Sequence, residues 1–230
     1  MAIPCAHINL DDITFASKPA TNANGGKYVS ISHQGGRPEN LLLGDRHTFS
    51  RVAFAPEQDQ TKPEKWTMKI EVGGDREAFV RAVEGKAVEA AVANNWLKRG
   101  VSAPSTDVVK ASLHSTLKES TKLEYPNPTF KMHVPPDVTE VMVAPSMEAL
   151  HEAEPGCLED IKQGMLALPV LRTKGGVWFS GAGFGLAFEA TNVLVVKKAG
   201  GAKRKLTGLG AFNLDGGETG AGFEEPPVSP

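Results

Sequence analysis

Basic residues stand beside aromatic ones at several places in the sequence. The groups are Lys27 with Tyr28, Trp66 with Lys69, Phe130 with Lys131, and Arg172 and Lys174 ahead of Trp178 and Phe179. This combination is typical of proteins that bind single-stranded nucleic acid, because aromatic faces stack on bases for roughly 1–3 kcal/mol each while Lys and Arg neutralise phosphates. A second interpretation stays open, since an aromatic residue on an alternating strand usually faces the core and its Lys neighbour faces water.

Motifs of catalysis and metal binding are missing from the sequence. Gly25-Gly26-Lys27 resembles the end of a phosphate-binding loop, but the earlier glycine is lacking and Tyr28 stands where a magnesium-binding hydroxyl residue belongs. The glycines at 181–185 precede an aromatic strand and not a helix, which indicates a tight hairpin. The histidines and cysteines do not repeat the spacing of a structural zinc site. We therefore expect no enzyme, no cofactor and no metal.

The elements that must position these residues are mainly strands. Polar and apolar residues alternate over residues 27–32, 66–72 and 130–134, between glycine or proline residues that indicate turns. Within residues 66–72 the side chains of one face are apolar, and those of the other face are Thr67, Lys69 and Glu71. Three further strands are predicted at 177–179, 184–188 and 193–196.

One amphipathic helix is predicted between these strands. It begins at Asp75, carries apolar residues on one broad face to Leu97, and is followed by Gly100. A weaker helical pattern covers residues 146–165, and residues 36–64 and 100–128 are predicted as long polar loops. The fold class that follows is mainly β (α+β), a barrel-like domain with an inserted helix.

Composition excludes several classes of protein. The 230 residues are 40% hydrophobic and 23% charged, with a net charge of −2, as in an ordinary globular protein. Two cysteines, Cys5 and Cys157, cannot form a disulfide framework, which favours an intracellular, reducing compartment. No apolar run approaches the ~20 residues that span a bilayer, and the first residues do not form a secretory signal, so we expect no membrane association.

The C-terminal residues differ in composition from the rest. Residues 206–230 are rich in Gly and Pro and contain acidic but no basic residues, which predicts a flexible tail beyond a domain of residues 1–205. Five cations precede this tail between Lys197 and Lys205. They fit a nuclear import signal, an anchor for the acidic tail, a phosphate-binding strip or a solvated cluster, and the sequence does not separate these.

The order of motifs resembles a known family. NLDDITF at 9–15 is followed by GGKYVSISHQGG at 25–36, the alternating strand at 66–72, a helix ending in Asn-Asn-Trp, YPNPTFKMHV at 125–134 and GVWFSGAGFG at 176–185. This succession, over about residues 8–198, resembles the single-stranded DNA-binding proteins of large nucleocytoplasmic DNA viruses and their relatives in some protists. Those are similar in turn to OB-fold single-stranded DNA-binding proteins of certain tailed phages.

The resemblance implies an OB-like β-barrel that coats single-stranded DNA, without sequence specificity, during replication, recombination or repair. The residues it implies for base stacking are Trp66, Phe130, Trp178 and Phe184, and those for phosphate contact are Lys69, Lys131, Arg172 and Lys174. Because Trp178 and Phe179 are adjacent on a strand, one is expected to face inward and the other outward.

The tail resembles a weak version of the acidic segment with which such proteins recruit replication partners. The residues concerned are Asp215, Glu218, Phe223, Glu224 and Glu225. The chain then ends in PPVSP, whereas the resemblance implies an acidic and aromatic tip. The expected location is the nucleus or another site of DNA replication. The alternative is a non-catalytic structural or interaction protein, such as a virion or particle component, built on the same barrel; homo-oligomerisation stays open for both.

Overall fold

The computed structural model describes residues 3–33, 41–42, 49–97, 104–120, 126–181 and 183–197. The chain divides into two units, residues 1–199 and 200–230, and every described residue lies in the first. The predicted tail and the cations from 198 to 205 fall outside the described residues. Among the described helices, none is both long and apolar enough to cross a membrane.

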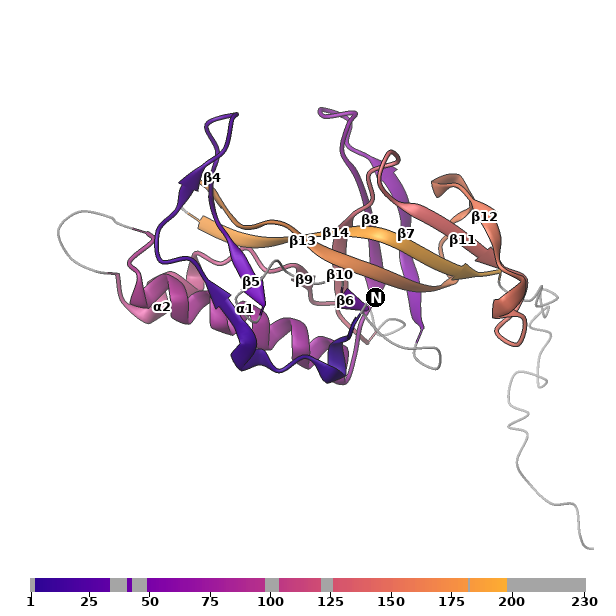
Figure 1. Cartoon of the computed structure of the whole chain (residues 1–230), viewed down its shortest axis with the longest axis horizontal. Helices are drawn as coiled ribbons and strands as arrows, with labels where there is room; N and C mark the ends of the chain where they lie inside the picture. Colours follow the sequence, from indigo (N-terminus) through magenta and orange to yellow (C-terminus); the bar gives the residue numbers. More distant parts are fainter. Residues whose placement is uncertain are drawn as a thin grey trace, which may run out of the picture. The chain divides into compact units, whose positions relative to one another are not determined.

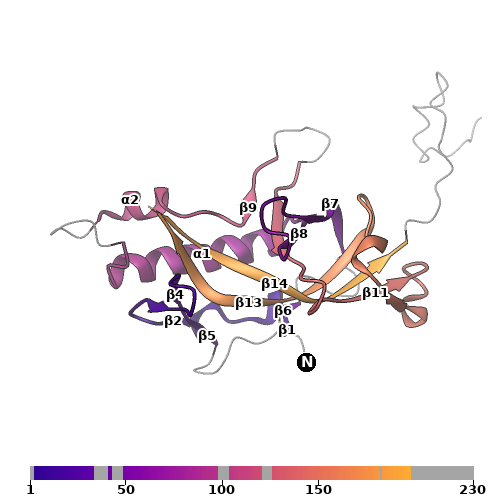
Figure 2. The same cartoon turned by 90° about the horizontal axis from the view of Figure 1, so that it is seen from above.

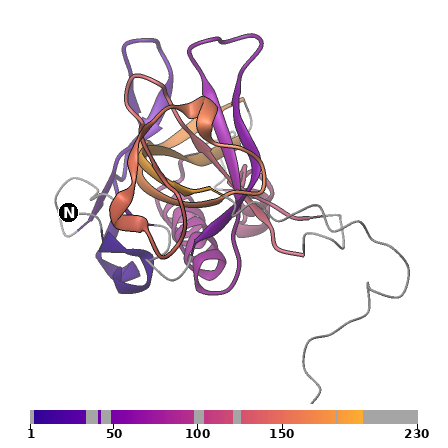
Figure 3. The ribbon, with the colours of Figure 1, turned by 90° about the vertical axis from the view of Figure 1, so that its right-hand side faces the viewer.

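Five strands form a closed barrel. They are β7 (Ser50–Gln58), β8 (Trp66–Glu71), β10 (Thr129–His133), β13 (Leu166–Ser180) and β14 (Gly183–Val196). Pairing runs from β7 to β8, β10, β14 and β13 and back to β7, with β10 and β14 parallel and the other pairs antiparallel. This is the strand order of an OB barrel, and Figure 3 shows the strands around its interior. The predicted mainly β fold with an OB-like barrel is confirmed.

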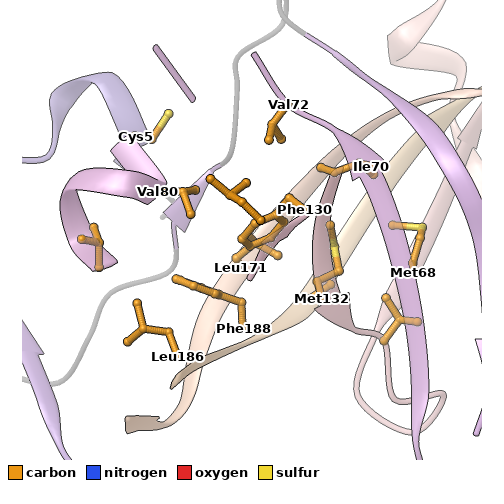
Figure 4. Close-up of a cluster of buried hydrophobic side chains, with 14 of the residues drawn as sticks. Cys5, Met68, Ile70, Val72, Val80, Phe130, Met132, Leu171, Leu186 and Phe188 are labelled. Carbon is orange, nitrogen blue, oxygen red and sulfur yellow. The ribbon is translucent and has the colours of Figure 1, made fainter. Parts of the chain in front are cut away.

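Alternation along the strands fills the barrel. Met68 and Ile70 of β8, and Phe130 and Met132 of β10, point inward and are fully or almost fully buried. Figure 4 shows these side chains packed with Leu186 and Phe188 of β14. Since neighbouring residues of a strand point to opposite faces, the inward set leaves the residues between them on the outer face.

Two helices, α1 (Asp75–Ala93) and α2 (Thr106–Ala111), are inserted between β8 and β10. The apolar face of α1 packs on the core, and the helix runs alongside the long β13–β14 hairpin (Figures 1 and 2). The predicted inserted helix is confirmed, but it ends earlier than Leu97. Asn94 caps it, and Asn95 takes a left-handed φ of 50° that no α-helix continues.

Three sequence-based predictions need correction. Residues 146–165 are not a helix but two single 3₁₀ turns around the short strand β12 (Glu154–Gly156), because Pro155-Gly156 breaks the helical pattern. The predicted loop at 36–64 contains the barrel strand β7. The predicted loop at 100–128 contains α2 and β9 (Leu117–Lys118). The strand β7 escapes recognition because a register shift between Val52 and Phe54 interrupts its alternation.

The β13–β14 hairpin continues past the barrel. There β13 pairs with β4 (Lys27–Val29), which pairs in turn with β3 (Ala20–Thr21). Figure 1 shows the β3–β4 and β7–β8 hairpins rising on the same side of the long hairpin. A separate pair joins β2 (Ile13–Phe15) to β5 (Ile31–His33). In the main sheet, β6 (Leu41–Leu42) joins β13 to the edge strand β1 (Ile3–Pro4), and β11 (Glu140–Ala144) joins β14 to the edge strand β12.

Candidate nucleic-acid interface

A groove of about 910 Å³ lies between the two rising hairpins. Its walls come from β3–β4, from the end of the β7–β8 loop, from β10 and from the segment that follows α2, and its floor comes from β13–β14. The rings that border this first groove are Tyr28, Trp66, His114, His133, Trp178 and Phe188. Residues far apart in the sequence therefore form one aromatic-lined channel.

Trp178 is the central ring of the first groove. Its Nε1 donates a hydrogen bond of 3.2 Å to the carbonyl oxygen of Leu186, and its ring stacks on His114 with centroids 5.4 Å apart and planes 15° from parallel. Tyr28 is its cross-strand neighbour on β4, and Gly185 is its neighbour on β14. A Cβ at Gly185 would lie 2.8 Å from the indole, so glycine is needed to leave room for this ring.

The inserted helix α1 fixes the wall that carries His114. Glu84 of α1 is 5% exposed and accepts hydrogen bonds from the Ser115 hydroxyl at 2.8 Å, the Thr116 hydroxyl at 2.9 Å and the Thr116 backbone N–H at 2.7 Å. The backbone N–H of His114 donates to Phe184 at 2.7 Å. Because charge-assisted hydrogen bonds are stronger than neutral ones, Glu84 holds this segment in one position against the hairpin.

The β7–β8 loop is held by its own hydrogen bonds. The carboxylate of Asp59 accepts from the Thr61 hydroxyl at 2.7 Å and from the backbone N–H groups of Thr61 at 2.8 Å and Lys62 at 3.1 Å. The Thr61 hydroxyl, with the two backbone donors, lowers the pKa of Asp59. These bonds favour the ionised form, so the turn that leads to Lys65 loses this support only as the pH falls through that lowered pKa.

Positive charge predominates in the first groove. Lys27, Lys65 and Lys131 border it, and Glu64 is the one acidic side chain among its described lining residues. A channel lined by cations concentrates anions near its walls. Within the described part of the chain, no group of three or more His, Cys, Asp or Glu side chains is placed to hold a metal ion.

The groove continues onto the outer face of the barrel. Lys69 of β8 is the direct cross-strand neighbour of Lys131, and Phe54 of β7 is the neighbour of Lys69 on the other side. The Phe54 ring is 52% exposed, and the Lys69 ammonium lies 4.7 Å from its centre. In an OB barrel the face of the second and third strands, here β8 and β10, and the loops beside it are the usual oligonucleotide surface. We call Phe54, Lys69 and Lys131 the outer face.

The predicted site residues separate into three groups. Trp66, Lys131 and Trp178 meet in the first groove, and Lys69 adjoins them on the outer face. Phe130 and Phe184 are 0% exposed, so their predicted stacking role is corrected to core packing. Each follows the alternation of its strand, which places Phe130 inside the barrel and Phe184 beside Trp96, in the segment after α1.

The remaining predicted residues lie elsewhere. Arg172 is not among the groove residues; its Nε donates to the buried Glu189 at 2.9 Å across the β13–β14 pair. The side chain of Lys174 lies outside the described part of the structure. So do the predicted partner-binding residues of the tail, from Asp215 to Glu225.

Sequence reasoning did not assign several interface residues. Tyr28 and Lys27 carry the signal of a basic and an aromatic neighbour but were not singled out for a site. His114 lies in a predicted loop, and Phe54 lies in the strand hidden by a bulge. Trp178 and Phe179 do face opposite ways, but neither is fully buried, because their part of the hairpin has passed the end of the barrel.

No protein family and no curated protein matches the sequence. Among solved structures, the single-stranded DNA-binding protein of bacteriophage Enc34 in complex with single-stranded DNA is similar at a TM-score of 0.41 and 13% identity, over 77% of this chain and 93% of that one. Its C-terminal truncation is similar at a TM-score of 0.42 and 14% identity, over 79% and 94%. Likeness at this level carries no conclusion about function, and membership of the viral and protist family stays a prediction.

Proposed function

We propose that the protein binds single-stranded DNA through the first groove and the outer face, without sequence specificity and without catalysis. The observation that carries this proposal is the half-buried Trp178 ring, fixed on His114 and bordered by the groove lysines. An aromatic platform inside a cationic channel is the arrangement that stacks unpaired bases while it neutralises their phosphates.

The same geometry accounts for the lack of sequence preference. Stacking is open to every base because each has a π-face, and lysine binds a phosphate whatever base is attached to it. Duplex DNA would offer Trp178 no free base to stack on. Of the cations expected to contact phosphate, Lys69 and Lys131 adjoin each other on neighbouring strands, whereas Arg172 pairs with Glu189 outside the first groove. The two adjacent lysines support DNA binding over the alternative of a structural or particle protein.

The cellular role that we propose is the coating of single-stranded DNA during replication, recombination or repair. The succession of motifs along the sequence supports this role, since it resembles proteins that act in those processes. With it we propose an intracellular location at the site of DNA replication, and recruitment of replication proteins by the tail residues Asp215, Glu218, Phe223, Glu224 and Glu225.

The test is fluorescence anisotropy of a labelled oligo-dT of about thirty nucleotides, titrated with the full chain at several salt concentrations. Four lysines, Lys27, Lys65, Lys69 and Lys131, border the proposed path, so log Kd should rise with log salt with a slope of roughly 3. Tryptophan emission should be quenched on binding, because Trp66 and Trp178 border the groove. Absence of binding at low salt, or a slope near zero, would contradict the proposal.

A further inference from the structure

A second groove, of about 680 Å³, lies against the other face of the β13–β14 hairpin. Phe179 borders it, whereas its chain neighbour Trp178 borders the first groove. The other walls come from residues 17–19, between β2 and β3, and from residues 94–97, after α1. We call this the second groove.

Ring contacts and a hydrogen bond connect the walls of the second groove. The Phe179 ring lies edge-on to Trp96, with centroids 6.1 Å apart, and beside the core ring of Phe184 at 6.3 Å. Trp96 also donates a hydrogen bond of 3.2 Å from its Nε1 to the carbonyl oxygen of Ser17. That bond joins the segment after α1 to the segment before β3, so the two walls hold a fixed separation.

The two asparagines that border the second groove differ in their side-chain hydrogen bonds. Asn94 donates from its Nδ2 to the Ala90 carbonyl oxygen at 2.9 Å and thereby caps α1. Asn95 has a φ of 50°, and its Oδ1 is buried without a hydrogen-bond partner. The left-handed φ ends α1, as at many helix C-termini, so it needs no ligand. The unsatisfied acceptor beside a groove is not explained by folding, and it points to a hydrogen-bond donor on a ligand.

Charge in the second groove suits a phosphate. Lys18 and Lys27 border it, and no acidic side chain occurs among its described lining residues. Lys27 borders the first groove as well. A nucleic-acid strand that lies in the first groove therefore meets the second groove at Lys27 without leaving a cationic surface.

We propose that the second groove is a nucleotide subsite for the same strand. One phosphate lies between Lys18 and Lys27, and its base stacks on Phe179. The Asn95 carboxamide, whose Oδ1 is buried without a partner, rotates toward the groove and accepts a hydrogen bond from the edge of that base. This proposal depends on the function proposed above. It adds a length requirement, since only oligonucleotides that extend past the first groove reach the second.

The test measures Kd for oligo-dT of about 4 to 30 nucleotides with the full chain, for the wild type, Lys18→Ala and Asn95→Gly. Asn95→Gly removes the carboxamide and tolerates the left-handed φ, and Lys18 is exposed, so both variants should fold. Short oligonucleotides should bind all three proteins equally. Beyond the length that reaches the second groove, each variant should bind about three- to tenfold more weakly. The control is Lys110→Ala, an exposed lysine on α2 outside both grooves.

A second experiment tests the base contact directly. A single abasic residue is moved along an oligonucleotide that fills both grooves. At one position it should weaken binding to the wild type more than binding to Asn95→Gly, because the variant has already lost the hydrogen bond to the base and keeps only the stacking on Phe179. If the wild type binds but both variants match it at every length and every abasic position, the subsite is overturned and the proposed function stands. If the wild type binds no oligonucleotide, the proposed function itself fails.

Discussion

The two faces of the β13–β14 hairpin place adjacent aromatic residues in different surroundings. Trp178 lies in a groove that three lysines also line, and it is held by a hydrogen bond and by the stacked ring of His114. Phe179 lies in a groove that two lysines and two asparagines also line, and it is held by the rings of Trp96 and Phe184. One face therefore supplies charge and stacking, and the other adds amides that can contact the edge of a base.

Because of this difference, we expect the two grooves to contribute differently to affinity and to preference among bases. Stacking and phosphate neutralisation treat all bases alike, so the first groove should contribute most of the binding free energy. Amides can make hydrogen bonds to base edges, so any preference among bases should come from the second groove. Variants on each face can test whether the two contributions are separable.

The largest effect is expected for Trp178→Ala. Loss of one stacked base corresponds to roughly 1–3 kcal/mol, or about 5- to 150-fold in Kd, and should appear with short and long oligonucleotides alike. The salt slope should stay unchanged, because no cation is removed. Anisotropy titrations at two oligonucleotide lengths measure both quantities. A loss confined to long oligonucleotides would place the main binding surface elsewhere.

A smaller effect on binding is expected for Glu84→Ala, through the position of the groove wall. Three hydrogen bonds to residues 115 and 116 are lost and a backbone donor is left without its partner, so the free energy of unfolding should fall by about 2–3 kcal/mol. That corresponds to a decrease in Tm of roughly 5–10 °C. Thermal melts with Glu89→Ala, an exposed change on the same helix, provide the control. Binding that stays at the wild-type level would show that the wall is not needed.

The next effect is expected for Lys131→Ala, which removes one cation between the first groove and the outer face. Kd should rise a few-fold at low salt, and the salt slope should fall by about 0.7, the value for one phosphate of a single strand. Lys162→Ala, an exposed lysine outside both grooves, should change neither. An unchanged slope for Lys131→Ala would remove this lysine from the path of the strand.

The alternation of polar and apolar residues predicted the barrel strands, because each strand has one face in the core and the other on the outside. Met68, Ile70 and Met132 follow a period of two so closely that their burial could be predicted from residue type. The same period could not show whether an aromatic residue faces the closed interior of the barrel or a groove beyond its end. Phe130 and Trp178 carry similar sequence signals, yet Phe130 faces the closed barrel and Trp178 faces a groove beyond its end.

The rest of the site depends on long-range pairing. His114 stacks on Trp178 because α1, through Glu84, fixes the segment after α2 against the hairpin. No local sequence pattern predicts a contact between residues so far apart in the chain. Phe54 escaped prediction for a local reason, since the bulge in β7 turns an apparent core residue to the outside. Such residues are found only once the strand register is known.

The smallest effect is expected for Phe54→Ala, which tests where the strand goes after the first groove. Two routes leave it: over the outer face past Phe54 and Lys69, or past Lys27 into the second groove. Phe54 is 52% exposed, so its removal should leave the Tm nearly unchanged while it weakens binding of long oligonucleotides two- to threefold. Comparison with Asn95→Gly at the same lengths ranks the two routes. A larger loss for Phe54→Ala would make the outer face the main continuation, and the two faces of the hairpin would then differ in use as well as in composition.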